Sequence, residues 1–236
     1  MKPLFAGVSL ALLALVACSP APAPDAAAPA ATIASAEIAA PAPVAIASPA
    51  GDYASDPNHS SVTFKLQHLG LSFYTLKFRT YDAIVSFDPA NIAASKVTAT
   101  IKPDDILAGY PSNYVANHPG TKFKSWEEDL ANSTNFLDAK QFPTITFTST
   151  SVAPSGERSA KVTGDLTLKG VTKPITLDVT FDGEMASHPF SKVPALGFSA
   201  TGTFKRTDFG IDYLAGMVGD EVSVQIEGDF IQKKPS

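Results

Sequence analysis

Apolar and polar residues alternate along most of the chain from Tyr53 onward, in short segments that turn residues separate. A period of two is typical of an antiparallel strand with one buried face, whereas an amphipathic helix repeats every 3.6 residues. In the first segment, Val62, Phe64, Leu66 and His68 alternate with polar residues. The pattern therefore predicts strands rather than helices.

The same alternation recurs along the chain and brings the total to about eight strands. Eight antiparallel strands can close into a barrel, whose interior is filled by side chains or just holds a small ligand. A two-sheet sandwich is the competing architecture, but Gly164, Gly202 and Gly228 lie mid-strand, where bends favour a barrel. The apolar positions of the further segments are Phe78 and Phe87; Val97, Ala99 and Ile101; Ile145 and Phe147; Val162, Leu166 and Leu168; Ile175, Leu177, Val179 and Phe181; Phe198, Ala200 and Phe204; and Val222, Val224, Ile226 and Phe230.

One helix is predicted, from Ser125 to about Ala139. Ser125 and Glu128 form a capping box, and Trp126 and Leu130 fall on one face. An irregular loop from Asp104 to Lys124 precedes this helix, and loops of that length are usually functional or mobile. The loop carries Tyr110, Tyr114, His118 and Phe123.

The N-terminal 50 residues differ in composition from the rest of the chain. Residues 1–17 have a basic start and then an apolar run too short to cross a bilayer comfortably, which is typical of an export signal. Leu15-Val16-Ala17-Cys18 resembles the lipobox of bacterial lipoprotein precursors, which implies that Cys18 becomes the acylated first residue; an incidental cysteine is the alternative. Residues 18–50, rich in Ala and Pro, are predicted to be a tether. The folded domain is expected over residues 51–236. By analogy with bacterial lipoproteins, the absence of Asp after the cysteine, where Ser19 stands, favours an outer-membrane anchor in the periplasm.

Composition and motifs narrow the range of functions expected for this chain. The chain has 18 Lys and Arg against 23 Asp and Glu, a net charge of −5, and no basic cluster, so nucleic acid is not an expected partner. The sequence contains no nucleophile elbow, phosphate loop or cysteine pair. The tripeptide Asp208-Phe209-Gly210 also occurs in protein kinases, but the other kinase motifs are absent from this sequence. The histidines His59, His68, His118 and His188 have no metal-ligand spacing, so no metal is expected.

Four ordered blocks give the chain a family resemblance. It is similar to the YceI-like family of periplasmic polyisoprenoid-binding proteins from about Tyr53 to Phe230. The loop 104–124 looks longer than is usual in that family, and the lipid anchor is a further departure. The blocks are Asp56-x-x-His59-Ser60-x-Val62-x-Phe64-x-x-x-His68; Asn135-Phe136-Leu137-Asp138-Ala139-x-x-Phe142-Pro143-x-Ile145-x-Phe147-x-Ser149-Thr150; Gly164-Asp165-Leu166-Thr167-Leu168-Lys169-Gly170-Val171-Thr172-Lys173-Pro174; and Arg206-Thr207-Asp208-Phe209-Gly210 followed by Gly219-Asp220-x-Val222.

The resemblance implies an all-β, eight-stranded antiparallel lipocalin-like barrel with one short helical insertion. Such a barrel would bind, carry or sequester an isoprenoid or similar long amphiphile, with no required cofactor; a homodimer is an option by analogy with the family. The candidate ligand-binding residues are Val62, Phe64, Leu66, His68, Phe78, Phe87, Ile145, Phe147, Leu166, Leu168, Leu177, Val179, Phe204 and Arg206.

Three points stay open. His68 is either a core histidine or a contact for a ligand head group, and Arg206 is either a barrel-corner device or a partner for a phosphate or quinone head. Two other functions compete with binding. One is a lipid-modifying enzyme that uses His68, His118 or Asp208, and the other is an interaction module whose barrel its own side chains fill.

Overall fold

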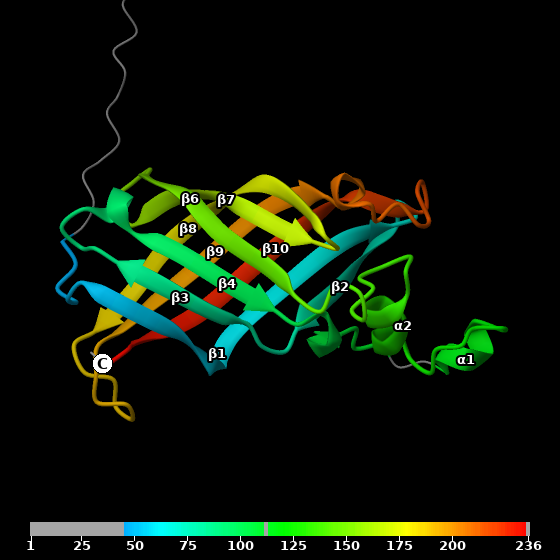
Figure 1. Cartoon of the computed structure of the whole chain (residues 1–236), viewed down its shortest axis with the longest axis horizontal. Coiled ribbons are helices and arrows are strands. Elements are labelled where there is room, and N and C mark those ends of the chain that lie inside the picture. The colour runs from blue at the N-terminus through cyan, green and yellow to red at the C-terminus, as the bar shows by residue number, and fades with distance from the viewer. Residues whose placement is uncertain (1–44, 111–112, 235–236) are drawn as a thin grey trace, which may run out of the picture. The chain divides into compact units, whose positions relative to one another are not determined.

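Eight antiparallel strands close into a barrel in the computed structural model, which describes residues 45–110 and 113–234 (Figure 1). Around the ring the order is β1-β3-β4-β6-β7-β8-β9-β10, and β10 pairs with β1 to complete it. The predicted all-β, eight-stranded barrel is confirmed. The strands are β1 (Gly51–His68), β3 (Asp82–Phe87), β4 (Lys96–Ile101), β6 (Ile145–Pro154), β7 (Ser159–Leu168), β8 (Val171–Met185), β9 (Ala195–Lys205) and β10 (Val218–Gln232).

Two further strands extend the sheet. β2 (Ser72–Phe78) pairs with the second half of β1, and β5 (Ile106–Leu107) pairs with β2. The segment from Phe78 to Phe87, predicted as one strand, is therefore divided between β2 and β3. The chain turns between them because the Arg79 amide donates to the Asp105 carbonyl at 3.0 Å, and the Thr80 hydroxyl donates to the Asp105 carboxylate at 2.9 Å.

A bulge in β1 separates its two pairing regions. The register with β10 shifts between Ser55 and Ser60, so the four residues between them lie outside the ladder. Asp56 closes the bulge: its carboxylate accepts from the Asn58 amide at 2.9 Å and lies 2.9 Å from His59 Nδ1. Before the bulge β1 pairs with β3, and after it β1 pairs with β2.

Gly164 lies at a second irregularity of the barrel wall. The register between β6 and β7 shifts next to it, and a Cβ at this position would lie 2.6 Å from the Thr148 carbonyl oxygen and against the Phe147 ring. The close approach explains why a glycine occurs within this strand.

The helices are shorter than the sequence predicts. α2 spans Trp126–Asn132, and its cap is as expected, because the Ser125 hydroxyl accepts from the Glu128 amide at 3.1 Å. The helix does not continue to Ala139, since Ser133 accepts from a following amide through its side chain and Asp138 has a φ of 49°.

The segment predicted as an irregular loop, 104–124, contains short elements of its own. They are β5, the helix α1 (Tyr114–Asn117) and the end of the 3₁₀ turn η2 (Pro103–Asp105). Two more 3₁₀ turns are η1 (Ile92–Ala94) and η3 (Arg206–Phe209). No helix among the described residues is long and apolar enough to cross a bilayer.

The folded part starts earlier than residue 51. The amides of Ala47 and Ser48 donate to the two carboxylate oxygens of Glu184 at 2.9 and 2.6 Å, and Ile46 packs against the core. We call residues 46–48 the strap. The export signal, Cys18 and the tether up to residue 44 lie outside the described residues.

Candidate ligand-binding cavity

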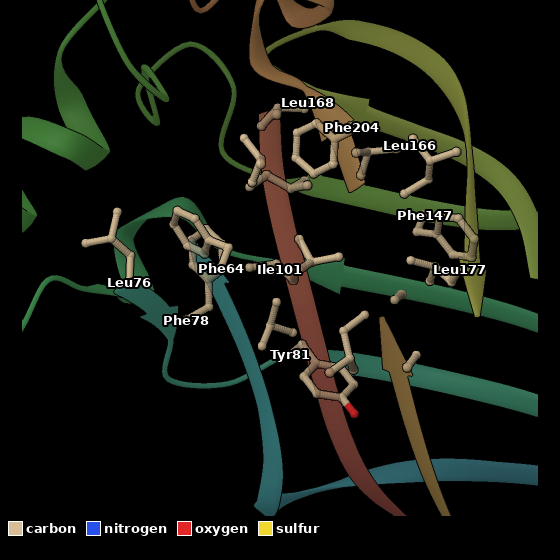
Figure 2. A pocket seen from close by; sticks show the side chains of 18 of the residues that line it. Phe64, Leu76, Phe78, Tyr81, Ile101, Phe147, Leu166, Leu168, Leu177 and Phe204 are labelled. Carbon is tan, nitrogen blue, oxygen red and sulfur yellow. The ribbon is translucent and has the colours of Figure 1, made fainter. Parts of the chain in front are cut away.

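The interior of the barrel is hollow. A cavity of about 580 Å³ runs through it, lined by side chains from the strands, and Figure 2 shows ten of them labelled around one shared space. This volume lies within the roughly 300–1,000 Å³ that is typical of small-molecule sites. The alternative of a barrel filled by its own side chains is therefore wrong.

Thirteen of the fourteen candidate residues line the cavity. They are Val62, Phe64, Leu66, Phe78, Phe87, Ile145, Phe147, Leu166, Leu168, Leu177, Val179, Phe204 and Arg206. For the twelve that lie on strands, the alternating pattern predicts this, because every second side chain of a barrel strand points inward. Arg206 lies in η3 and was a candidate through the family resemblance.

His68 is the exception, and its expected place facing the cavity is corrected. The register between β1 and β10 shifts between Leu66 and His68, whereas the register between β1 and β2 continues to His68. Its ring lies 4.6 Å from the ring of Tyr74, which does line the cavity. His68 therefore contacts a lining residue but does not itself line the cavity.

The lining is almost entirely apolar. Among the residues that form it, Asp129 and Arg206 are the only ones with a formal charge at neutral pH when histidine is neutral. Both are already engaged by the protein. The Tyr114 hydroxyl donates to the Asp129 carboxylate. Burial, and then the bond to this carboxylate, raise the pKa of Tyr114 far above its ordinary value.

Arg206 is a structural residue by its contacts. Its guanidinium donates to four backbone carbonyls at 2.8 to 2.9 Å, and the side chain is buried. Four bonds from one cation fix the connection between η3 and β10, which favours the barrel-corner interpretation of Arg206 over a role at a ligand head group. The four carbonyls belong to Ile211, Tyr213, Val218 and Gly219.

One end of the cavity is closed by buried side chains. Tyr53 and Leu196 are 0% and 1% exposed and do not line the cavity, so they lie beyond its end. The Tyr53 ring meets Phe87 edge-on at 6.1 Å, and its hydroxyl donates to the Pro49 carbonyl at 2.7 Å. We call this part the closed end; it holds the start of β1, the end of β8 and the strap.

The other end is open. Tyr110, Tyr213 and Leu214 line the cavity and are also 38%, 43% and 36% exposed, so the cavity reaches the surface between them. We call this the mouth. It lies where β1 and β9 end and β2 and β10 begin.

A cluster of rings stands at the mouth, and the strand pattern did not place it. Trp126 lies at its centre, 5.0 Å from Tyr114, 4.9 Å from His118 and 6.3 Å from both Tyr74 and Tyr110. The available signal was the density of aromatic residues in segment 104–124. Because that segment has no period of two, the sequence could not show which way its side chains point.

A metal site is not formed by the part of the chain that the structure describes: no three His, Cys, Asp or Glu side chains gather closely enough to hold an ion. The enzyme hypothesis also finds little support in the geometry. Of His68, His118 and Asp208, only His118 lines the cavity, and its ring is stacked on Tyr114 at 4.2 Å.

A comparison with known protein families identifies the family of this chain. The profile of the YceI-like domain matches residues 53–230. The chain belongs to the YceI-like family. A relative in Pseudomonas savastanoi pv. phaseolicola, described as a UPF0312 protein, is 36% identical over 187 residues, which cover 78% of this chain and 88% of the relative.

Solved YceI-like structures have the same barrel. BcnA of Burkholderia cenocepacia superposes with a TM-score of 0.60 at 25% identity, over 74% of this chain and 98% of BcnA. The YceI protein of Campylobacter jejuni matches with a TM-score of 0.54 at 28% identity, over 71% and 90%. A polyisoprenoid-binding domain from Saccharophagus degradans shares the fold, with a TM-score of 0.52 at 12% identity, over 78% of this chain and all of that one. The match covers almost the whole of BcnA, so in that protein the barrel stands without a further domain.

Proposed function

We propose that this YceI-like domain binds a polyisoprenoid or similar long-chain amphiphile inside its barrel and carries or sequesters it in the cell envelope. The observation that carries the proposal is the 580 Å³ cavity with a nearly uncharged lining. Removing apolar surface from water contributes roughly 25 cal/mol per Å², so a slender hydrocarbon gains most from such a space, although ordering the chain offsets part of that gain. The polyisoprenoid-binding domain of Saccharophagus degradans, which has the same fold, supports this class of ligand.

The geometry of the cavity favours one orientation of the ligand. The tail extends toward the closed end, where Tyr53 and Leu196 are packed, and the head stays near the ring cluster at the mouth. An uncharged head such as an alcohol, amide or quinone suits this site better than a phosphate or carboxylate. The reason is that the guanidinium of Arg206, the one Lys or Arg side chain of the lining, already donates to four carbonyls.

The location of the protein is proposed from its sequence. Acylation of Cys18 would hold the domain at the outer membrane on the periplasmic side, and it is supported by the lipobox-like Leu15-Val16-Ala17-Cys18. Replacement of Cys18 by Ser should release the protein from the membrane fraction. Metabolic labelling with a palmitate analogue should mark the natural protein and not this variant.

Neighbouring residues on opposite faces of β9 allow a matched test of binding. Ala200 lines the cavity, whereas Thr201 next to it is exposed. Ala200→Trp should fill the middle of the cavity, and Thr201→Trp should leave it open. Fragment 45–236 would be delipidated and titrated with a fluorescent long-chain probe, which prenols of increasing chain length would then displace.

We expect affinity to rise with prenol length in the natural sequence and in Thr201→Trp, and to be lost in Ala200→Trp. The smaller change Ala200→Leu should restrict binding to shorter prenols. Circular dichroism would establish that each variant is folded. Equal binding by Ala200→Trp and Thr201→Trp, both folded, would place the ligand outside the barrel and overturn the proposal.

A further inference from the structure

Exposed apolar side chains gather around the mouth. Leu71 is 84% exposed and Phe73 is 63% exposed, and Leu69 and Met217 are about half exposed. With Leu214, which also lines the cavity, they form what we call the mouth tip: Leu69, Leu71, Phe73, Leu214 and Met217. Contiguous apolar surface of this kind on a soluble domain usually marks an interaction site.

The mouth tip is one surface made of two chain segments. The turn from β1 to β2 carries Leu69 and Leu71, and the connection from η3 to β10 carries Leu214 and Met217. The Leu69 amide donates to the Met217 carbonyl at 2.8 Å, which joins the two segments directly. Figure 1 shows both at the same end of the barrel, away from the loop between β8 and β9.

Charge is sparse in the loops around the mouth, although α2, whose Trp126 belongs to the ring cluster there, carries Glu127, Glu128 and Asp129. Residues 68–76 and 106–121 contain no Lys, Arg, Asp or Glu, and residues 209–219 contain Asp212 alone, in a chain of which 17% is charged. An interface with another protein usually has a rim of polar and charged groups. A charge-free tip of Leu, Phe and Met with Tyr and Trp rings behind it instead resembles the surfaces that enter the interface of a bilayer.

The mouth tip is also continuous with the cavity. Leu214 belongs to both, and Tyr110 and Tyr213 line the cavity while they face the surface. The Tyr110 hydroxyl accepts from the Thr75 amide at 3.1 Å, which attaches this rim to β2. An apolar path therefore leads from the tip into the barrel. The described chain ends do not obstruct it, because Ser48 and Gln232 are bonded at the closed end, to Glu184 and Pro194.

We propose that the mouth tip docks on a lipid bilayer, with Leu71 and Phe73 inserted among the lipids, so that the cavity opens directly toward the membrane. A hydrophobic ligand would then pass between bilayer and barrel without crossing water. Docking does not depend on which ligand the cavity binds. An experiment can therefore contradict membrane docking without contradicting the proposed ligand, and the reverse.

The chain offers a matched pair of positions to test this. Cys18 is the only cysteine, so fragment 45–236 has none, and it also lacks the acylation site. Leu71 is 84% exposed at the mouth tip, and Phe190 is 85% exposed in the loop between β8 and β9. Leu71→Cys and Phe190→Cys would each be labelled with the environment-sensitive dye NBD. They would then be mixed with unilamellar vesicles of phosphatidylcholine and phosphatidylethanolamine.

We expect the dye at residue 71 to shift its emission to the blue when vesicles are added, and the dye at residue 190 to stay unchanged. Leu71→Asp should weaken vesicle partitioning by about tenfold, since a charge is costly in the membrane, whereas Phe190→Asp should change it less than about twofold. Both variants should keep the long-chain probe in the cavity, which separates lost docking from lost ligand binding.

Two results would overturn the proposal. One is an equal response, or none, at the two positions. The other is a blue shift at residue 71 that grows with protein concentration without vesicles, because that result would assign the mouth tip to a contact between two copies of the chain.

Discussion

The closed end and the mouth of the barrel are both rich in apolar side chains, but the two ends differ in how particular side chains are covered. Leu196 and Tyr53 are 1% and 0% exposed, whereas Leu71 and Phe73 at the mouth are 84% and 63% exposed. Composition does not separate the two ends. The difference comes from which segments cover the apolar side chains.

The wall of the barrel explains that difference. At the closed end β1 pairs with β3 and β10, so the ladder is continuous, and the strap lies against the core. Toward the mouth β1 pairs with β2 instead, and α2 packs against β5 and η2 to complete the wall. Backbone ladders reach both ends, and at the mouth the shorter elements β2, β5 and α2 take the place that β3 has beside β1 at the closed end.

The largest expected effect compares a leucine from each end. Leu196→Ala leaves a void in the packed closed end and should lower the free energy of unfolding by roughly 2–5 kcal/mol. Leu71→Ala, at an exposed position, should change it by less than about 0.5 kcal/mol. Urea denaturation of both variants gives the two values, and similar losses would contradict the contrast between the ends.

Arg206 tests whether the mouth is rigid despite its exposed surface. Arg206→Met leaves four carbonyls without their donor and should lower the free energy of unfolding by about 3 kcal/mol. The exposed neighbour provides the control, since Lys205→Met should have an effect below about 0.5 kcal/mol. If Arg206→Met were as stable as the control, Arg206 would be free to contact ligand.

Glu184 should make the closed end sensitive to acid. Partial burial opposes the charged carboxylate, but hydrogen bonds from Ser48 and from the Ala47 amide outweigh it and lower the pKa of Glu184. A carboxyl with a lowered folded-state pKa stabilises the fold above its ordinary value of 4.5, and that contribution is lost as the pH falls through the folded-state pKa.

Hydrogen exchange at the Ala47 and Ser48 amides measures this effect. Protection should be present at neutral pH, fall as the pH drops below 4.5 and through the folded-state pKa, and be weaker in Glu184→Gln at neutral pH. Amides of the mouth, such as that of Leu69, provide the internal reference. Strap protection that is independent of both pH and residue 184 would show that Glu184 does not hold the strap.

The smallest effect is expected at the bulge between the two regions of β1. The side-chain hydrogen bond to Asp56 raises the pKa of His59 above its ordinary value of 6.5, and the bond to His59 lowers the pKa of Asp56. The stabilisation by His59 is complete below 6.5 and is lost as the pH rises through the folded-state pKa. An NMR titration should show this raised value and its return toward 6.5 in Asp56→Asn; an unchanged titration would mean that the pair is not formed.

The period-two pattern predicted the walls of the barrel well. It identified twelve lining residues on strands, because alternation along a strand translates directly into inward and outward faces. It failed at His68 and in the segment from Phe78 to Phe87, where a register shift and a turn interrupt the period. Such interruptions depend on partners distant in sequence, such as Val218 and Asp105.

The two ends of the barrel could not be predicted in the same way. Residues 46–48 have the composition of a tether, yet Glu184, more than 130 residues away in sequence, binds their amides. In the ring cluster around Trp126, Tyr110, Tyr114 and His118 lie on a segment without a period of two. Sequence pattern therefore located the cavity but not which end is open, because closure depends on contacts between distant segments.

The central claim is that the cavity holds one long hydrocarbon chain. Native mass spectrometry of fragment 45–236, purified from bacterial cells without detergent, tests it most directly. We expect one adduct per chain, which solvent extracts as an isoprenoid or fatty amphiphile, in the natural sequence and in Thr201→Trp but not in Ala200→Trp. If the natural sequence and both variants show only the mass of the protein without an adduct, before and after incubation with prenols, the result would contradict the account.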